Sequence, residues 1–228
     1  MNNISQASVL FVGCIGYLLY FYILKNSTIQ NQFRQLFSKP KSSFYWIQLI
    51  RIAAFSCMAL LPIIYTICLG INFWDANFTW TYTDTKYTLI FALVLIPLAA
   101  INARGKEHLA MYPQVKMDNW SPFEYLSNIL SWGIYLLGYE FLFRGILFLG
   151  LLPFVGIAAG IIINTVLYAA AHIYKGKKET LGSIPLGIVL CLITAQTETI
   201  WTAFAVHWIM ASNNFIWSQY YTSKYNMK

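Results

Sequence analysis

The sequence predicts an all-α polytopic membrane protein with about seven transmembrane helices. Hydrophobic residues make up 58% of the 228 residues and charged residues only 10%, whereas soluble domains carry about 25% charged residues. The hydrophobic residues come in long blocks, and a helix needs about 20 mostly apolar residues to cross a bilayer. Basic residues, which give a net charge of +7, gather between these blocks. That placement predicts loops that face anionic lipid rather than a nucleic-acid surface.

Seven apolar blocks are expected to span the membrane. They run over Ala7–Leu24, Ile52–Trp74, Tyr87–Ala103, Ser131–Leu152, Phe154–Tyr174, Leu181–Ala195 and Thr199–Trp217. The longest connection, Lys25–Arg51, is expected to carry a short interfacial helix, and Pro122–Leu130 a second one that feeds the fourth span. Residues 1–120 would then form the N-terminal helices and loops, 121–217 the core with the functional residues, and 218–228 a cytoplasmic tail.

The basic residues predict the orientation of these spans. With the N-terminus outside, every Lys and Arg falls in an inside loop or in the C-terminal tail, except Lys86 outside and Arg144 within a span. Lys and Arg concentrate in cytoplasmic loops, so the C-terminus is expected inside. Short loops and the absence of a targeting segment favour the inner membrane of a bacterium.

Four titratable residues lie inside the expected spans or at their ends. Glu140 and Arg144 are spaced i, i+4 and share a helix face, His207 lies in the last span, and His172 lies near the inner end of the fifth. Ionisable groups at this depth are costly and indicate functional sites. The alternative for the Glu–Arg pair is an ion pair that only fixes packing, and the alternative for each His is a satisfied core residue.

Further polar residues accompany the two His residues. Asn164, Tyr168 and His172 are spaced i, i+4, i+8 and form a polar stripe on one face of the fifth span. Asn214 follows His207 by seven residues and lies on roughly the same helix face. Three polar groups in line within a membrane span favour a functional interpretation.

These motifs resemble those of the CPBP family, the CAAX-processing and bacteriocin-processing intramembrane proteases, which are also called the Abi family. The family shows Glu-Glu-xxx-Arg, then Phe-xxx-His, then His-xxx-Asn or a close variant. The matching segments here are Tyr139-Glu140-Phe141-Leu142-Phe143-Arg144, Tyr168-Ala169-Ala170-Ala171-His172 and the segment that begins at His207. The resemblance covers roughly residues 121–217 and implies a CAAX-protease-like helical bundle. Two positions depart from the pattern, because Tyr139 replaces the first Glu and Ala211 replaces the Asn.

The resemblance also implies roles for single residues. Glu140 would activate water in place of the missing carboxylate, His172 would position that water or bind a metal, and His207 would stabilise the oxyanion. The residues expected to support these three are Arg144, Tyr139, Tyr168, Asn164, Asn213 and Asn214. His172, His207 and Glu140 could also form an open zinc site, although the chain has no HExxH sequence.

Glu140 and His172 must meet if they act together. A straight helix from Pro122 would carry Glu140 about 27 Å along its axis, near the outer face, whereas His172 lies near the inner one. A bend at Ser131 or Gly133 would instead place Glu140 about 14 Å into the span. The sequence therefore predicts a bend there and a cavity open to the cytoplasmic side.

Three functions fit these observations. The first is an intramembrane endopeptidase that cleaves a peptide or membrane-protein substrate near the cytoplasmic face. The second is a non-catalytic protein of the same fold that binds a membrane partner, as the departures at Tyr139 and Ala211 suggest. The third is a small transporter with an ion path through Glu140, Arg144 and His172, which the lack of visible inverted repeats disfavours. The expected partners are a substrate and the lipid bilayer, with no nucleic acid.

Overall fold

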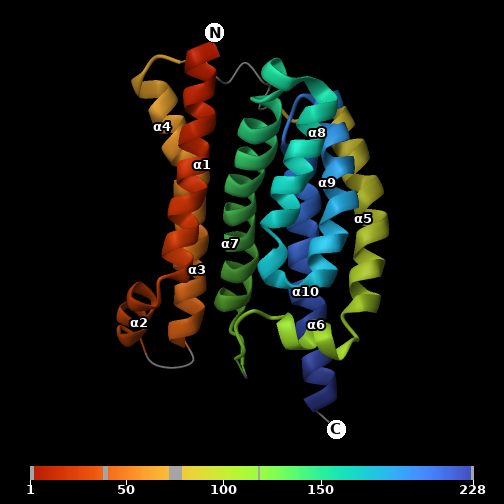
Figure 1. The fold of residues 1–228 in the computed structure, drawn as a ribbon. Coiled ribbons are helices and arrows are strands. Elements are labelled where there is room, and N and C mark those ends of the chain that lie inside the picture. Colours follow the sequence, from red (N-terminus) through yellow and green to blue (C-terminus); the bar gives the residue numbers. More distant parts are fainter. Residues whose placement is uncertain (1–2, 38–40, 72–78, 118, 227–228) are drawn as a thin grey trace.

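The structure is a computed structural model that describes residues 3–37, 41–71, 79–117 and 119–226, and within these ranges every regular element is a helix. Figure 1 shows long helices side by side, with the N-terminus at one end of the bundle and the C-terminus at the other. The elements are α1 (Asn3–Lys25), α2 (Ser27–Gln35), α3 (Lys41–Phe55), the π-helical η1 (Ser56–Leu60), α4 (Leu61–Cys68), α5 (Tyr82–Asn102), α6 (Lys106–Met111), α7 (Pro122–Glu140), the π-helical η2 (Phe141–Leu149), α8 (Leu152–Ala170), the 3₁₀ turn η3 (Ile173–Lys175), α9 (Lys177–Thr197) and α10 (Trp201–Asn226).

The prediction of an all-α membrane protein is confirmed. Six helical stretches in the described residues are long and apolar enough to cross a bilayer. They are Ile4–Lys25, Lys41–Cys68, Tyr82–Asn102, Pro122–Leu149, Leu152–Ala170 and Lys177–Thr197. The seventh expected span falls on α10, which packs against α5 and α7, and its crossing stays a prediction. The expected end of the second span, Trp74, lies outside the described residues.

The N-terminal connection is shorter than the sequence predicts. The short helix expected between Lys25 and Arg51 is present as α2, but α3 already begins at Lys41. The early start follows from packing, because Phe44 and Trp46 are buried and extend the apolar face of α3. Arg51, expected in a loop, is therefore buried inside the helix.

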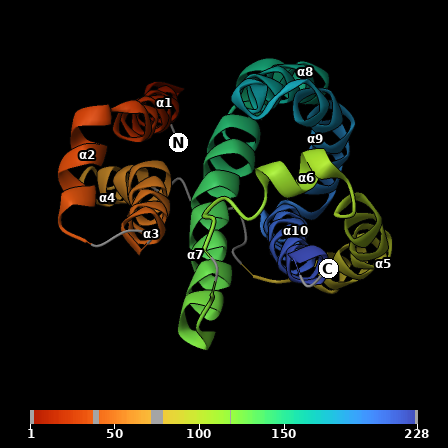
Figure 2. The same ribbon diagram turned by 90° about the horizontal axis from the view of Figure 1, so that it is seen from below.

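Helix α7 is continuous through Ser131 and Gly133, where a bend was predicted. It runs unbroken from Pro122, where Ser121 and Glu124 form the capping box that starts it, and it continues into η2 without a separate interfacial helix. Gly133 serves close packing instead, since a Cβ there would lie 3.1 Å from the Trp208 indole. Ser131 accepts a hydrogen bond from Arg51. Figure 2 shows α7 in the middle, between α1–α4 on one side and α5 with α8–α10 on the other.

A short α8, and not a bend in α7, brings His172 close to the end of α7. Gly156 has non-helical angles (φ 75°, ψ 173°), so the regular part of α8 begins only after it. The 14 residues from there to Ala170 are about 21 Å long. The His172 ring centroid consequently lies 6.4 Å from that of Tyr139. The two motifs meet because α8 ends within the bundle.

The other end of the chain continues as helix. Residues 218–226, expected to form a tail, extend α10 to Asn226. Tyr221 is buried there, and its hydroxyl accepts a hydrogen bond from Arg104 at 3.0 Å. The helix thus packs beyond Trp217 against the turn between α5 and α6.

The basic residues gather where the sequence predicts. Figure 1 shows α2, α6 and the C-terminus at one end of the bundle. The basic residues at the helix ends and turns on this side are Lys25, Arg34, Lys41, Arg104, Lys106, Lys177, Lys178 and Lys224. We call it the basic end. Its assignment to the cytoplasmic side stays a prediction.

Candidate functional site

A cavity of about 300 Å³ lies between α7, α8, α9 and α10. Three of these helices line it with residues spaced i, i+3, i+4, i+7, which is one face of a helix. These residues are Trp132, Tyr135, Leu136 and Tyr139 on α7, Glu179, Gly182, Ser183 and Leu186 on α9, and His207, Met210, Ala211 and Asn214 on α10. Tyr168 and His172 reach it from α8 and the turn after it, and Tyr112 from the segment after α6. Because α10 runs opposite to α7 and α9 (Figure 1), Tyr139 and His207 form the floor and Glu179 and Asn214 the mouth, which faces the basic end.

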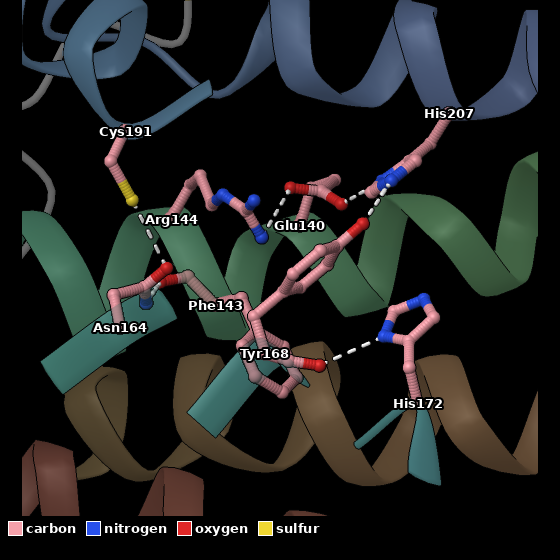
Figure 3. A network of polar contacts seen from close by, with 8 residues as sticks. All are labelled: Glu140, Phe143, Arg144, Asn164, Tyr168, His172, Cys191 and His207. Atoms are coloured by element: carbon pink, nitrogen blue, oxygen red, sulfur yellow. Dashed lines mark hydrogen bonds and ion pairs between the residues drawn. The ribbon is translucent and has the colours of Figure 1, made fainter. Parts of the chain in front are cut away.

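A chain of polar contacts lies at the floor of this cavity (Figure 3). The Glu140 carboxylate accepts a hydrogen bond from His207 Nδ1 and lies 3.4 Å from Arg144 Nη1. The other ring nitrogen of His207, Nε2, lies 2.5 Å from the Tyr168 hydroxyl. Glu140 and Arg144 are fully buried, and Tyr168 and His207 nearly so. Four side chains from α7, η2, α8 and α10 are thereby held in one network.

The charges in this network balance each other. Arg144 follows Glu140 by one helical turn, and the expected ion pair forms. The Arg144 guanidinium also stacks over the Tyr168 ring, with its carbon 4.4 Å from the ring centroid. A buried charge is tolerated when it is paired. The ion pair and the cation–π contact therefore allow both charges to lie at the centre of the bundle.

Glu140 lies behind His207 and not in the cavity wall. Its two carboxylate oxygens face His207 and Arg144, and it is not one of the residues that line the cavity. Tyr139, which replaces the family's first Glu, lines the cavity in its place. The Tyr139 hydroxyl is buried and has no hydrogen-bond partner among the described residues. The geometry therefore gives Glu140 contact with an imidazole rather than with cavity water.

His172 is oriented by the main chain. Its Nδ1 lies 2.8 Å from the Tyr168 carbonyl oxygen. A carbonyl can only accept, so Nδ1 carries the hydrogen. In the neutral ring Nε2 then has the lone pair and can act as a base or an acceptor. His172 and His207 both line the cavity, and His207 is the one whose ring donates to Glu140.

The three Asn residues of the expected site have different places. Asn164 donates to the Phe143 carbonyl at 2.6 Å and accepts from Cys191 Sγ at 3.2 Å, so it ties η2 to α8 and α9 away from the cavity. Asn213 donates to the Ile209 carbonyl of its own helix at 2.9 Å. Asn214 lines the mouth of the cavity. Of the three, Asn214 is therefore the one that a substrate in the cavity can reach.

The expected zinc ligands do not form a ligand set. The ring nitrogens of His207 face Glu140 and Tyr168, so neither is directed to a metal shared with His172. The described residues contain no group of three His, Cys, Asp or Glu side chains placed to hold a metal ion. The arrangement of His172, His207 and Glu140 therefore does not fit a zinc site.

Glu179 is a residue of the cavity wall that the sequence motifs do not indicate. It lies in the first turn of α9 and contributes a carboxylate to the lining. Gly182 and Leu186 follow it on the same face. This i, i+3, i+7 spacing, in a segment that the sequence predicts as partly loop, is the signal that could have indicated it.

Comparison with known proteins agrees with the motifs. Residues 120–212 match the family described as type II CAAX prenyl endopeptidase Rce1-like. No curated protein and no solved structure matches the chain. The matched segment contains the Glu140–Arg144 pair and both His residues of the cavity. The match supports the assignment of this core to the CPBP family of CAAX-type intramembrane proteases.

Proposed function

We propose that this protein is an intramembrane endopeptidase that cleaves a peptide or a membrane-protein segment in the cavity between α7 and α10. The observation that carries the proposal is the convergence of His172, from the turn after α8, and His207, from α10, on one cavity of about 300 Å³. One imidazole is held by a main-chain carbonyl and the other by a buried carboxylate. Oriented imidazoles beside a cavity are the groups that proton transfer to and from a reacting water requires.

His172 acts as the general base in this proposal. Its Nε2 takes a proton from a water, the oxygen of that water attacks the carbonyl carbon of the peptide bond, and the same proton then passes to the leaving amine. His207, when protonated, donates through Nε2 to the Tyr168 oxygen, and the hydroxyl hydrogen of Tyr168 then stabilises the charge on the carbonyl oxygen. Glu140 acts through His207, whose ring it orients as the carboxylate of a catalytic triad does. Arg144 balances the charge of Glu140.

Cleavage of a fluorogenic peptide library by the protein purified in detergent tests this proposal. We expect His172→Ala and His207→Ala each to lower kcat/KM by about 100-fold, the usual contribution of a positioned acid or base. Glu107→Gln is the matched control, since Glu107 is exposed at the basic end and is not one of the residues that line the cavity. Cleavage at wild-type rates by both His variants would show that the cavity is not the catalytic site.

A non-catalytic, partner-binding function is the second candidate. Tyr139 stands in the cavity wall where the family has a carboxylate, and Ala211 stands where it has an amide. In the same assay, no cleavage by the natural chain together with activity in Tyr139→Glu would favour partner binding. Tyr139→Phe, which keeps the ring and removes the hydroxyl, is the control for packing. Cleavage by the natural chain and none by Tyr139→Glu would favour the protease.

The proposal also assigns the mouth of the cavity to the cytoplasmic face of a bacterial inner membrane, because Lys and Arg concentrate on the cytoplasmic side. A Cys introduced at Lys106, at the basic end, is expected to resist membrane-impermeant thiol reagents in intact cells and to react after lysis. Labelling of this Cys in intact cells would reverse the orientation.

A further inference from the structure

A second cavity, of about 100 Å³, lies beside the first one, where α1 and α3 approach α7, and Trp132 and Tyr135 line both. Figure 2 shows that these helices lie across α7 from the helices of the first cavity. We infer that this second cavity binds the phosphate group of an anionic phospholipid through Arg51. The inference is independent of the proposed protease activity.

Arg51 is a buried cation with no buried anion beside it in the described part of the chain. Its side chain is 4% exposed. Its Nη1 donates to the Asn128 carbonyl, the Asn128 amide oxygen and the Ser131 hydroxyl at 2.7–3.1 Å, and its Nη2 donates to Gln114 at 3.0 Å. All of these acceptors are neutral. The described residues provide no carboxylate within ion-pair distance of Arg51.

Arg144, unlike Arg51, has a carboxylate beside it. It is also buried, and it has Glu140 as its counter-charge at 3.4 Å. Removing a charge from water is unfavourable unless an opposite charge compensates it. Neutral dipoles and the Trp132 ring, 4.1 Å from the Arg51 guanidinium carbon, offset only part of that cost. A bound anion would supply the missing charge.

The cavity presents Arg51 together with further groups suited to a phosphate. Tyr20, Tyr135 and Tyr174 line it, and Tyr135 hydrogen-bonds with the other two. A phenol hydroxyl at the end of such a chain can donate to a phosphate oxygen. Lys25 adds a second cation at the edge, with its Nζ 5.5 Å from the Tyr174 ring centroid. A guanidinium with nearby hydroxyls and an ammonium is the donor set that proteins use for phosphate.

The position of the cavity favours a lipid as the source of that phosphate. Leu24, which lines it, lies in the last turn of α1, at the basic end of the bundle. The outer face of α1 is apolar and exposed, as Leu18 and Phe21 show, so lipid chains can pack beside it. Basic pockets between transmembrane helices at this level bind anionic headgroups. The small volume fits one phosphate, while the rest of the lipid would lie outside along α1.

Native mass spectrometry of the full chain, purified in mild detergent and supplied with defined lipids, tests the inference. We expect one saturable phosphatidylglycerol to be retained, and its addition to raise the thermal unfolding midpoint. Diacylglycerol, which has no phosphate, should bind at least about tenfold more weakly, because it cannot accept from Arg51. Inorganic phosphate alone should not raise the midpoint. A rise with inorganic phosphate and none with the lipid would overturn the lipid as the source.

Two variants test the site itself. Arg51→Gln removes the charge, and Leu24→Trp fills the cavity while leaving the Arg51 hydrogen bonds in place. We expect both to lose the retained lipid. Arg34→Gln, on α2 at the same end of the bundle, is the matched control and should keep it. The site would be refuted if Leu24→Trp retained the lipid as well as the wild type does, or if the natural chain retained no lipid. Either result counts even if Arg51→Gln does not fold.

Discussion

Replacement of Glu140 by Gln is expected to lower the free energy of unfolding by about 3–5 kcal/mol, because it leaves the buried Arg144 without its counter-charge. Both side chains are fully buried, so water cannot take the place of the carboxylate. The His207 ring also loses the anion that accepts from its Nδ1. Equilibrium unfolding of the purified protein in detergent measures the change.

Two variants separate this ion pair from general effects of mutation. The pair of Glu107 and Lys178 is exposed and screened by water, so it contributes little to stability, and Glu107→Gln should unfold like the wild type. The double replacement of Glu140 by Gln and Arg144 by Met should recover part of the stability lost in Glu140→Gln, since it removes both charges. An unchanged unfolding free energy in Glu140→Gln would show that the pair does not stabilise the bundle. Because this variant unfolds more easily, His172→Ala gives the cleaner test of catalysis.

Substitution of Gly16 by Ala is expected to destabilise the bundle by about 3 kcal/mol or more, at the upper end of overpacking effects. An ideal Cβ on Gly16 would lie 2.0 Å from the Cys57 carbonyl oxygen, which belongs to the π-helical η1. The neighbour is main chain, so a rotation of a side chain cannot relieve the clash. Small residues permit this kind of close helix contact in membranes. The midpoint of thermal unfolding and the yield of monodisperse protein report the effect.

Gly182→Ala is the matched control for Gly16→Ala. Gly182 lies within α9, and a Cβ there would meet nothing within 4 Å. Ala is the better helix former by about 1 kcal/mol, so this variant should be as stable as the wild type or more stable. Equal loss of stability in the two variants would mean that the contact between α1 and η1 is not as tight as its geometry indicates.

Local sequence patterns predict much of this fold correctly. Long apolar blocks predict the helices, because a bilayer requires each spanning segment to satisfy its own main-chain hydrogen bonds. Ser121 and Glu124 predict the start of α7, and the capping box forms as expected. The i, i+4 spacing of Glu140 and Arg144 predicts their ion pair. In each case the interacting groups are close in the sequence.

Sequence-based prediction is wrong where packing between helices determines the shape of a helix or the residue at which it begins. Ser131 and Gly133 suggest a bend in α7, but their small size serves contacts with Arg51 and Trp208. Arg51 resembles a loop residue at the start of an apolar block, yet α3 begins ten residues earlier because its aromatic face packs against the bundle. The same small or charged residue can occur at a bend, in a loop or in a packed helix. Only its neighbours in the tertiary structure distinguish these cases.

The sequence by itself determined that this is a helical membrane protein with the motifs of the CPBP proteases. Only the tertiary structure decided how those motifs act on one another. It placed Glu140 behind His207 and Tyr139 in the cavity wall, and it joined the hydroxyl of Tyr168 to the other side of the His207 ring. These contacts join α7, α8 and α10, and they depend on where the break at Gly156 lets α8 end. Periodicity describes one helix at a time, whereas depth and rotation of one helix against another follow from side-chain packing across the whole bundle.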